Sequence, residues 1–149
     1  MEVFRINSEK YSQVLTASGT ENRWNKSGEF VIYTGSSRSL ATLELVVHRS
    51  AIVPTMNYKV MIIHIPDDPS LVQQIQISNL IPNWRLKTGY PKLQAIGSNW
   101  YKNQLSLILK VPSAIIPLEF NFIINTKHRD FGKIVLSEVE DYFWDIRLF

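Results

Sequence analysis

Cysteine is absent from the 149 residues of this chain. Its absence excludes disulfide bonds, thiol nucleophiles and zinc sites built on cysteine. The three histidines, His48, His64 and His128, lack the spacing of metal ligands, so we expect no metal site. Glycine-rich phosphate loops, nucleophile elbows and kinase signatures are missing too, which excludes the enzymes that carry those motifs.

Long apolar runs are also missing. No segment approaches the roughly 18 apolar residues that span a bilayer. The first residues, Met-Glu-Val-Phe-Arg, lack the basic and apolar regions of a signal peptide. We therefore expect no membrane association and a cytoplasmic location, a reducing compartment that suits a chain without cysteine.

Positive charge is only slightly in excess. Sixteen basic and thirteen acidic residues give a net charge of +3, and no basic cluster of the nucleic-acid-binding kind is present. A nucleic-acid-binding domain would rest on the isoelectric point of about 9.2 alone, so we expect no direct binding to nucleic acid. Acidic residues are absent between Asp68 and Glu119, where the basic residues are Arg85, Lys87, Lys92, Lys102 and Lys110. That segment is either a solvated face or a surface for a phosphate or an acidic partner.

The composition is that of a folded domain. Apolar residues make up 45% of the chain, the aromatic residues are four Trp, six Tyr and seven Phe, and no linker or repeat interrupts residues 1–149. Helices are predicted after Ser36 and Ser37, for about twelve residues, and over Lys92–Tyr101. A polar loop is predicted over Ser18–Gly28. The segments with strand patterns are Val3–Ile6, Phe30–Thr34, Asn57–Ile65, a short one around Ile75–Ile77, a half-buried one over Leu105–Val111, Phe120–Ile124, Lys133–Ser137 and Tyr142–Arg147.

About seven strands and two or three helices follow in an order that is not a simple βαβ alternation. This order predicts a single α+β domain with mixed or antiparallel sheets.

A few polar residues are candidates for a functional site. Glu44 lies in the otherwise apolar segment Leu40–His48, so its carboxylate either shows on the polar side of a helix or is paired, hydrogen-bonded or shifted in pKa. His48 follows four residues later, which predicts an ion pair on one helix face. Arg23 in the polar loop, Tyr33 in a strand and Ser113 after Pro112 each have an ordinary structural explanation as well.

Together these residues form part of an ordered set that spans the chain. The set is Phe4-Arg5-Ile6, Arg23-Trp24-Asn25, Val31-Ile32-Tyr33, Leu43-Glu44 with His48, Gly97 with Trp100, Val111-Pro112-Ser113-Ala114, Asn121 with Asn125, His128 with Asp130-Phe131, and Asp145 to Phe149. It resembles the RES domain, which is named for an Arg, a Glu and a Ser that correspond here to Arg23, Glu44 and Ser113. Two departures are Glu21-Asn22 in place of the usual Gly-Gly, and Asn125-Thr126 in place of Asn-Pro.

The resemblance implies a function. RES proteins are the toxins of bacterial toxin–antitoxin pairs, have a fold similar to that of the ADP-ribosyltransferases such as diphtheria toxin, and consume NAD. It implies catalytic roles for Arg23, Glu44 and Ser113 and substrate binding by Trp24, Asn25 and Tyr33. It also implies an Xre-type DNA-binding antitoxin as partner, with a toxin dimer within the complex as one arrangement, and no cofactor besides NAD as substrate.

The chemistry agrees with these residue types. Cleavage of the nicotinamide–ribose bond leaves positive charge on the ribose, which a carboxylate such as Glu44 stabilises. An arginine such as Arg23 offers a forked donor to pyrophosphate. The acceptor stays open between water, inorganic phosphate as co-substrate and a protein side chain. An inactive RES fold that only binds its antitoxin is a further alternative.

Overall fold

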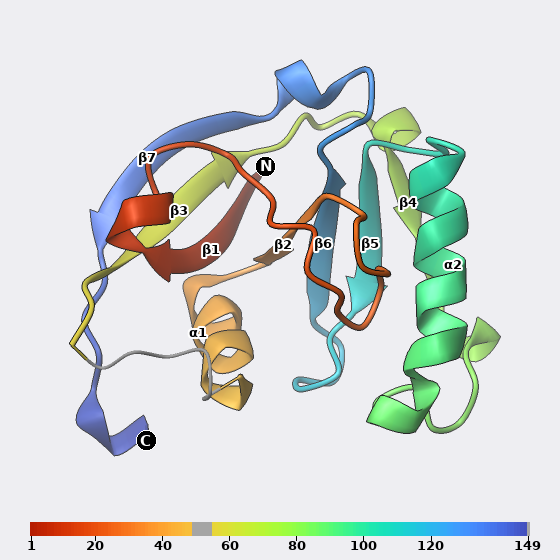
Figure 1. The fold of residues 1–149 in the computed structure, drawn as a ribbon, viewed down its shortest axis with the longest axis horizontal. Helices are drawn as coiled ribbons and strands as arrows, with labels where there is room; N and C mark the ends of the chain where they lie inside the picture. Colours follow the sequence, from red (N-terminus) through yellow and green to blue (C-terminus); the bar gives the residue numbers. More distant parts are fainter. Residues whose placement is uncertain (49–54, 149) are drawn as a thin grey trace.

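The computed structural model describes residues 1–48 and 55–148 (Figure 1). Its strands are β1 (Glu2–Ser8), β2 (Val31–Gly35), β3 (Tyr58–His64), β4 (Val72–Gln74), β5 (Ile108–Pro112), β6 (Phe120–Asn125) and β7 (Val135–Asp141). Its α-helices are α1 (Arg38–Val47) and α2 (Tyr90–Lys102). In the described parts of the chain, no helix has the length and apolar character needed to cross a membrane.

The strands form one mixed sheet in the order β4-β5-β6-β2-β1-β3-β7. Among these strands β4 and β5 pair in parallel, and the other neighbours are antiparallel. The predicted α+β class with mixed sheets is confirmed.

This sheet is two sheets joined at one point. β1 and β3 pair over seven residues and β2 and β6 over five, whereas β1 and β2 meet at a single pair, Phe4 and Gly35. Beyond that pair the strands diverge, and β1, β3 and β7 turn away from β2, β6, β5 and β4 (Figure 1). The unpaired edges of β1 and β2 therefore face each other across an opening in the middle of the sheet.

The two helices cover the same face of the sheet, one on each half. α1 packs over Phe4, Ile6 and Ile62, and α2 packs over a cluster that includes Leu109 and Ile123. Phe4 pairs with Gly35, and successive strand residues alternate between faces, so both clusters lie on one side. A third cluster, with Val3, Ile63 and Ile124 among its members, fills the other side.

Gly35 lets α1 approach the sheet closely. A Cβ atom at Gly35 would lie 3.1 Å from the backbone nitrogen of Ala41, which is tighter than ordinary packing. Ser37 caps the N-terminus of the helix, as the sequence predicts: its side chain accepts a hydrogen bond from the Leu40 backbone N–H. The close approach brings the inner face of α1 over the end of β2.

Most predicted elements are confirmed, and three are wrong in position or burial. The short strand lies at Val72–Gln74, and Ile77–Asn79 is a 3-10 turn. The described residues of Tyr142–Arg147 form no strand, because β7 ends at Asp141, opposite Lys59 near the start of β3. β5 begins at Ile108 and is buried on both faces instead of one, because the α2 cluster covers one face and the third cluster the other.

Candidate active site

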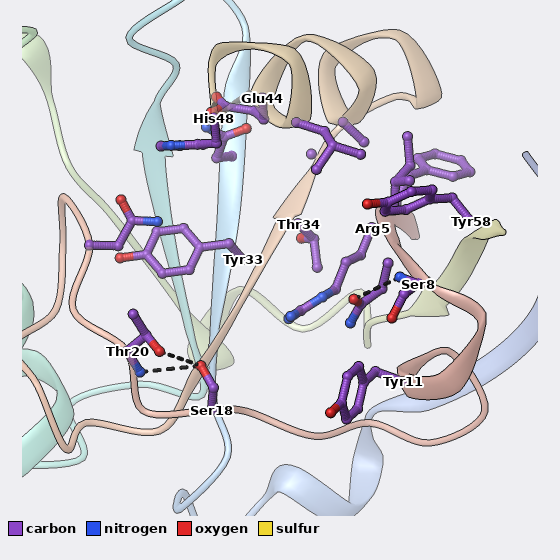
Figure 2. Close-up of a pocket in the computed structure, with 18 of the residues that line it drawn as sticks. Arg5, Ser8, Tyr11, Ser18, Thr20, Tyr33, Thr34, Glu44, His48 and Tyr58 are labelled. Atoms are coloured by element: carbon purple, nitrogen blue, oxygen red, sulfur yellow. Dashed lines mark hydrogen bonds between the residues drawn. The ribbon is translucent and has the colours of Figure 1, made fainter. Parts of the chain in front are cut away.

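A cavity of about 590 Å³ opens where β1 and β2 diverge (Figure 2). Its walls are residues 4–8 of β1, part of β2, the inner face of α1 and the loop around residues 18–22. A smaller cavity of about 70 Å³ adjoins it, and the residues common to both are Asn22, Tyr33, Glu44, His48 and Asn121. The opening in the sheet is thus a site with two compartments. The volume of the larger one is typical of pockets that bind small molecules.

Glu44 lies where the two compartments meet. Its Oε1 accepts a hydrogen bond of 2.7 Å from Nδ2 of Asn121, on β6. Asn121 pairs with Gly35 of β2, directly beneath the start of α1. Of the alternatives left open for Glu44, the structure shows the hydrogen-bonded one, and the carboxylate is presented to the cavity (Figure 2).

The predicted ion pair between Glu44 and His48 does not form. Neither a hydrogen bond nor an ion pair joins these two described residues; Asn121 takes the place of the histidine. His48 ends α1 as its C-cap, and its exposed ring lies at the rim of both compartments.

Arg23 lies in the smaller compartment, fixed from one side. Its Nη1 donates to the carbonyl oxygens of Trp84 and Arg85, each at 2.8 Å, and its guanidinium group lies 4.8 Å from the ring centroid of Tyr90. The Nε and Nη2 groups have no acceptor among the described residues. Arg23 is therefore an oriented cation with donors to spare, unlike an ordinary solvated loop arginine.

Tyr33, Trp24 and Asn25 form one hydrogen-bonded unit. The Tyr33 hydroxyl donates to Oδ1 of Asn25 at 2.6 Å and accepts from the Trp24 backbone N–H at 3.1 Å. Nδ2 of Asn25 donates to the carbonyl oxygens of Thr20 and Lys26. Burial raises the pKa of Tyr33 well above its usual value, so its hydroxyl stays protonated.

These three residues relate differently to the cavity. Tyr33 lines both compartments and Trp24 the smaller one, whereas Asn25 lines neither and holds the loop together from inside. Substrate binding by Trp24, Asn25 and Tyr33 stays a prediction, but the geometry makes Asn25 a support of the site.

Ser113 lies in the turn that follows β5. Its Oγ accepts hydrogen bonds from the backbone N–H groups of Ile115 and Ile116, both at 3.1 Å, and its side chain is buried. The neighbouring residues Ala114 and Ile115 line the smaller compartment, but Ser113 does not. Its described contacts are those of a turn residue, and its catalytic role stays a prediction.

The loop that departs from the family pattern has Glu21 and Asn22 where the family has Gly-Gly. Glu21 and Asn22 both line the larger compartment, and neither has a positive φ angle. The Asn22 carbonyl accepts a hydrogen bond of 2.9 Å from Gln94 of α2. Residues 21 and 22 therefore have backbone conformations that do not require glycine.

Arg5 is the site residue that sequence reasoning did not weigh. Its side chain extends from β1 into the larger compartment, beside Thr34 (Figure 2). Burial lowers its pKa from the usual value, yet no hydrogen bond or ion pair to another described residue balances its charge. The available signal was a single charge inside the apolar strand Val3–Ile6.

The segment between Asp68 and Glu119 reaches the smaller compartment through uncharged residues such as Tyr90, but not through its basic side chains. None of its five lysines and arginines lines either compartment. Arg85 lies over the ring of Trp84, and Lys110 lies over that of Phe120. The two alternatives for these side chains, a solvated face and a surface for a phosphate or an acidic partner, stay open; the described arginines and lysines that line the compartments are Arg5 and Arg23. Among the described residues, no group of three or more metal-ligating side chains is present.

Comparisons with known proteins place the chain in a family. The family model of the RES domain matches residues 2–145. The chain is 33% identical to Toxin Res of Yersinia enterocolitica over 154 aligned positions, which cover 99% of each chain. It is 32% identical to the Prs ADP-ribosylating toxin of Sphingobium sp. over 130 residues, 87% of this chain and 81% of that one.

A solved structure has the same fold. A chain of the crystal structure of the M. tuberculosis MbcT-MbcA toxin-antitoxin complex superposes with a TM-score of 0.75 at 15% identity, covering 95% of this chain and 83% of that chain. The family match extends over nearly the whole chain and agrees with the ordered set of residues found in the sequence. This chain therefore belongs to the RES domain family of toxins.

Proposed function

We propose that this chain is the toxin of a cytoplasmic toxin–antitoxin pair and that it depletes NAD by cleaving the nicotinamide–ribose bond. The observation that carries the proposal is the position of Glu44, a carboxylate held by Asn121 between two compartments. Each compartment has an arginine with donors that no described residue accepts, Arg5 in the larger and Arg23 in the smaller. A carboxylate flanked by two anion-binding groups suits a dinucleotide whose reactive carbon bears transient positive charge.

The reaction needs no general acid from the protein to protonate the leaving group. When the bond between ribose C1′ and the pyridinium nitrogen breaks, the electron pair stays on nicotinamide, which departs neutral and needs no proton. The ribose is left with oxocarbenium character, and a preorganised carboxylate stabilises that charge. Glu44 takes this role in the proposal. The guanidinium groups of Arg5 and Arg23 bind the pyrophosphate oxygens, which match their forked donors.

The acceptor in this proposal is water or inorganic phosphate. Purified protein incubated with NAD is expected to release nicotinamide. Separation of the products by chromatography distinguishes ADP-ribose, formed with water, from its 1-phosphate, formed with phosphate. Absence of nicotinamide release over hours at micromolar enzyme, in buffers with and without phosphate, would contradict the proposal.

The Glu44→Gln variant tests the carboxylate itself. It keeps the shape of the side chain and removes the charge, so we expect a fall of about 10²–10³ in kcat, the usual cost of losing one preorganised electrostatic contact. Glu138→Gln, an exposed position on β7, is the matched control and should keep full activity. An active, folded Glu44→Gln protein would remove Glu44 from the mechanism.

Transfer of ADP-ribose to a protein side chain is a second candidate. It is supported by the relative named Prs ADP-ribosylating toxin. NAD labelled in the adenosine part should then label a protein band in a cell extract, and nicotinamide release should rise when that protein is added. The third alternative, an inactive fold that only binds an antitoxin, predicts no NAD turnover at all.

An Xre-type antitoxin is the proposed partner, and it inhibits by covering the cavity. The occurrence of this fold in a toxin-antitoxin complex supports a partner protein. Inhibition should be competitive with NAD, and co-expression should restore growth. A tight complex that still turns over NAD at the full rate would contradict occlusion.

A further inference from the structure

We propose that Asn121 is a positioning residue that holds the Glu44 carboxylate in its reactive orientation. This inference rests on the proposed NAD cleavage and adds a residue to it. Nδ2 of Asn121 lies 2.7 Å from Oε1 of Glu44, and Asn121 lines both compartments. In this inference Asn121 acts on the reaction through Glu44, whose carboxylate it orients.

The orientation of the Asn121 amide is fixed by chemistry. A carboxylate oxygen only accepts hydrogen bonds, so the group that faces Glu44 must be the NH₂ group of Asn121. Its Oδ1 must then point the other way. That oxygen is buried and has no hydrogen-bond partner among the described residues.

A buried oxygen without a partner lowers stability, and native proteins seldom keep one without a reason. Leucine, of nearly the same shape, would fill the position without a buried polar atom. Among the described residues, the one contact that the asparagine side chain gains in return is its hydrogen bond to Glu44. Asparagine at this position therefore lowers the stability of the fold, and what it provides in return is the hydrogen bond to Glu44.

The backbone of Asn121 is rigid on both sides. β6 lies between β2 and β5, and Asn121 pairs with Gly35 on one side and Val111 on the other. α1 packs closely against Gly35, and Glu44 of this helix reaches β6 through its hydrogen bond to Asn121. The donor is thus built into the centre of the sheet, whereas the acceptor stands on a helix. Loss of the bond leaves the Glu44 side chain free to change rotamer, and a shift of about 1 Å in a reacting group costs up to about 100-fold in rate.

Three variants of Asn121 separate positioning from folding. Asn121→Ala and Asn121→Leu both remove the donor, and we expect kcat for nicotinamide release to fall about 10- to 100-fold with a much smaller change in KM. Asn121→Leu also removes the unpartnered oxygen, so its melting temperature should equal or exceed that of the wild type. Asn79→Ala, at an exposed position away from the cavity, is the control and should leave both quantities unchanged.

The third variant, Asn121→Asp, gives a signature that a structural role would not produce. When the introduced carboxyl group is protonated it donates to Glu44 as the amide does, whereas in its ionised form it repels Glu44. The ratio of variant to wild-type kcat should therefore be near one at about pH 5 and fall as the pH rises towards about pH 8. Taking the ratio cancels the groups that behave alike in both proteins around this position, among them Arg5, Glu21, Arg23, Tyr33, Tyr90 and His48, and leaves the pair formed by residue 121 and Glu44.

The outcomes separate this inference from the proposed function. Wild-type protein that releases no nicotinamide overturns both. Active wild type with equally active, folded Asn121→Ala and Asn121→Leu variants overturns the positioning role alone. A fall in kcat that merely follows a loss of folded protein, with a flat pH ratio for Asn121→Asp, assigns Asn121 to stability and also overturns it.

Discussion

Two arginines in the first half of the chain, Arg38 and Arg5, differ in their exposure and in their acidic partners. Arg38, at the exposed start of α1, makes a two-pronged hydrogen bond to Glu140, which raises its pKa and lowers that of Glu140. Arg5 is half-buried, and its loss of contact with water lowers its pKa, with no described acidic partner to offset the cost. A partly buried cation without a counter-charge disfavours folding and favours the binding of an anion.

Arg5→Gln is expected to weaken NAD binding without weakening the fold. The variant removes a buried charge, so its melting temperature should stay the same or rise. KM for NAD should rise at least tenfold, because the proposed charge-assisted hydrogen bond to pyrophosphate would be lost. Arg38→Gln is the control, and it should leave KM unchanged. A lower melting temperature with an unchanged KM would make Arg5 a structural residue.

Tyr33→Phe tests the hydrogen-bonded unit that shapes the loop. The change leaves Oδ1 of Asn25 and the Trp24 backbone N–H without their partner, which should lower the free energy of unfolding by about 1–3 kcal/mol. Urea unfolding measures the loss. Tyr11→Phe is the control, because its exposed hydroxyl has no hydrogen-bond partner among the described residues. Equal midpoints for the two variants would contradict the assignment.

The same tyrosine gives the stability of the protein a dependence on alkaline pH. Burial raises the pKa of Tyr33 in the folded state, so above about pH 10 only the unfolded chain releases this proton. Stability from this group is complete below that pH and is lost as the pH rises through it. Wild type should therefore lose more stability than Tyr33→Phe between about pH 9 and pH 11. Parallel pH curves for the two proteins would contradict it.

At the scale of elements, α2 holds the arginine loop by a direct backbone contact. A Cβ atom at Gly97 would lie only 1.7 Å from the Trp24 carbonyl oxygen, so the helix touches the loop where glycine alone fits. Gln94, one turn earlier, donates to the Asn22 carbonyl. The helix therefore sets the position of Arg23 without lining the cavity at Gly97.

Gly97→Ala is expected to destabilise the protein and slow NAD cleavage. Alanine favours a helix over glycine by about 1 kcal/mol, but overpacking against a backbone atom costs about 1–3 kcal/mol. A separation of 1.7 Å puts this position at the upper end, so the clash wins. Gly132→Ala is the control, since nothing lies within 4 Å of a Cβ atom there. Thermal melts and kcat measure both effects; a more stable Gly97→Ala protein would mean that the loop yields freely.

Elements defined by local signals were predictable, and those defined by distant partners were not. The cap at Ser37 and the spacing of Leu40, Leu43 and Val47 predict α1 correctly from neighbouring residues. β4 is a strand because Val72 pairs in parallel with Ile108, a contact that the local pattern around residue 75 does not contain.

The residues of the site likewise divide into those that local sequence could predict and those that it could not. Glu44 stood out in the sequence because a lone charge in an apolar helix is visible locally. Asn121 and Arg5 matter only because two strands diverge, and the single residue pair that joins β1 to β2 cannot be read from either strand alone.

At the scale of the whole molecule, the cavity is the seam between two half-sheets. Walls from β1 on one side and from β2 and β6 on the other enclose it, and a ligand bound there contacts both halves. Ligand binding should therefore stiffen the junction as well as fill the cavity.

Addition of ADP-ribose, the larger part of the proposed substrate, should raise the melting temperature. At a concentration 100-fold above Kd the expected stabilisation is about 2.7 kcal/mol. Hydrogen exchange should slow at the facing edges of β1 and β2 and change little at β4 and β7. Arg5→Gln should show a smaller shift in melting temperature at the same ligand concentration. Protection confined to other strands would place the ligand elsewhere.

The single-pair junction also bears on when the candidate site can assemble during translation. Glu44 is synthesised 77 residues before Asn121, and β2 has no long ladder until β6 has been made, because its pairing with β1 is one residue long. β3, the long partner of β1 among the described strands, gains its second neighbour when β7 leaves the ribosome. A nascent chain shorter than 121 residues therefore has the carboxylate but not the site around it. While the chain is still being synthesised, the protein therefore lacks a complete site, and the fold is complete only when the last strands have left the ribosome.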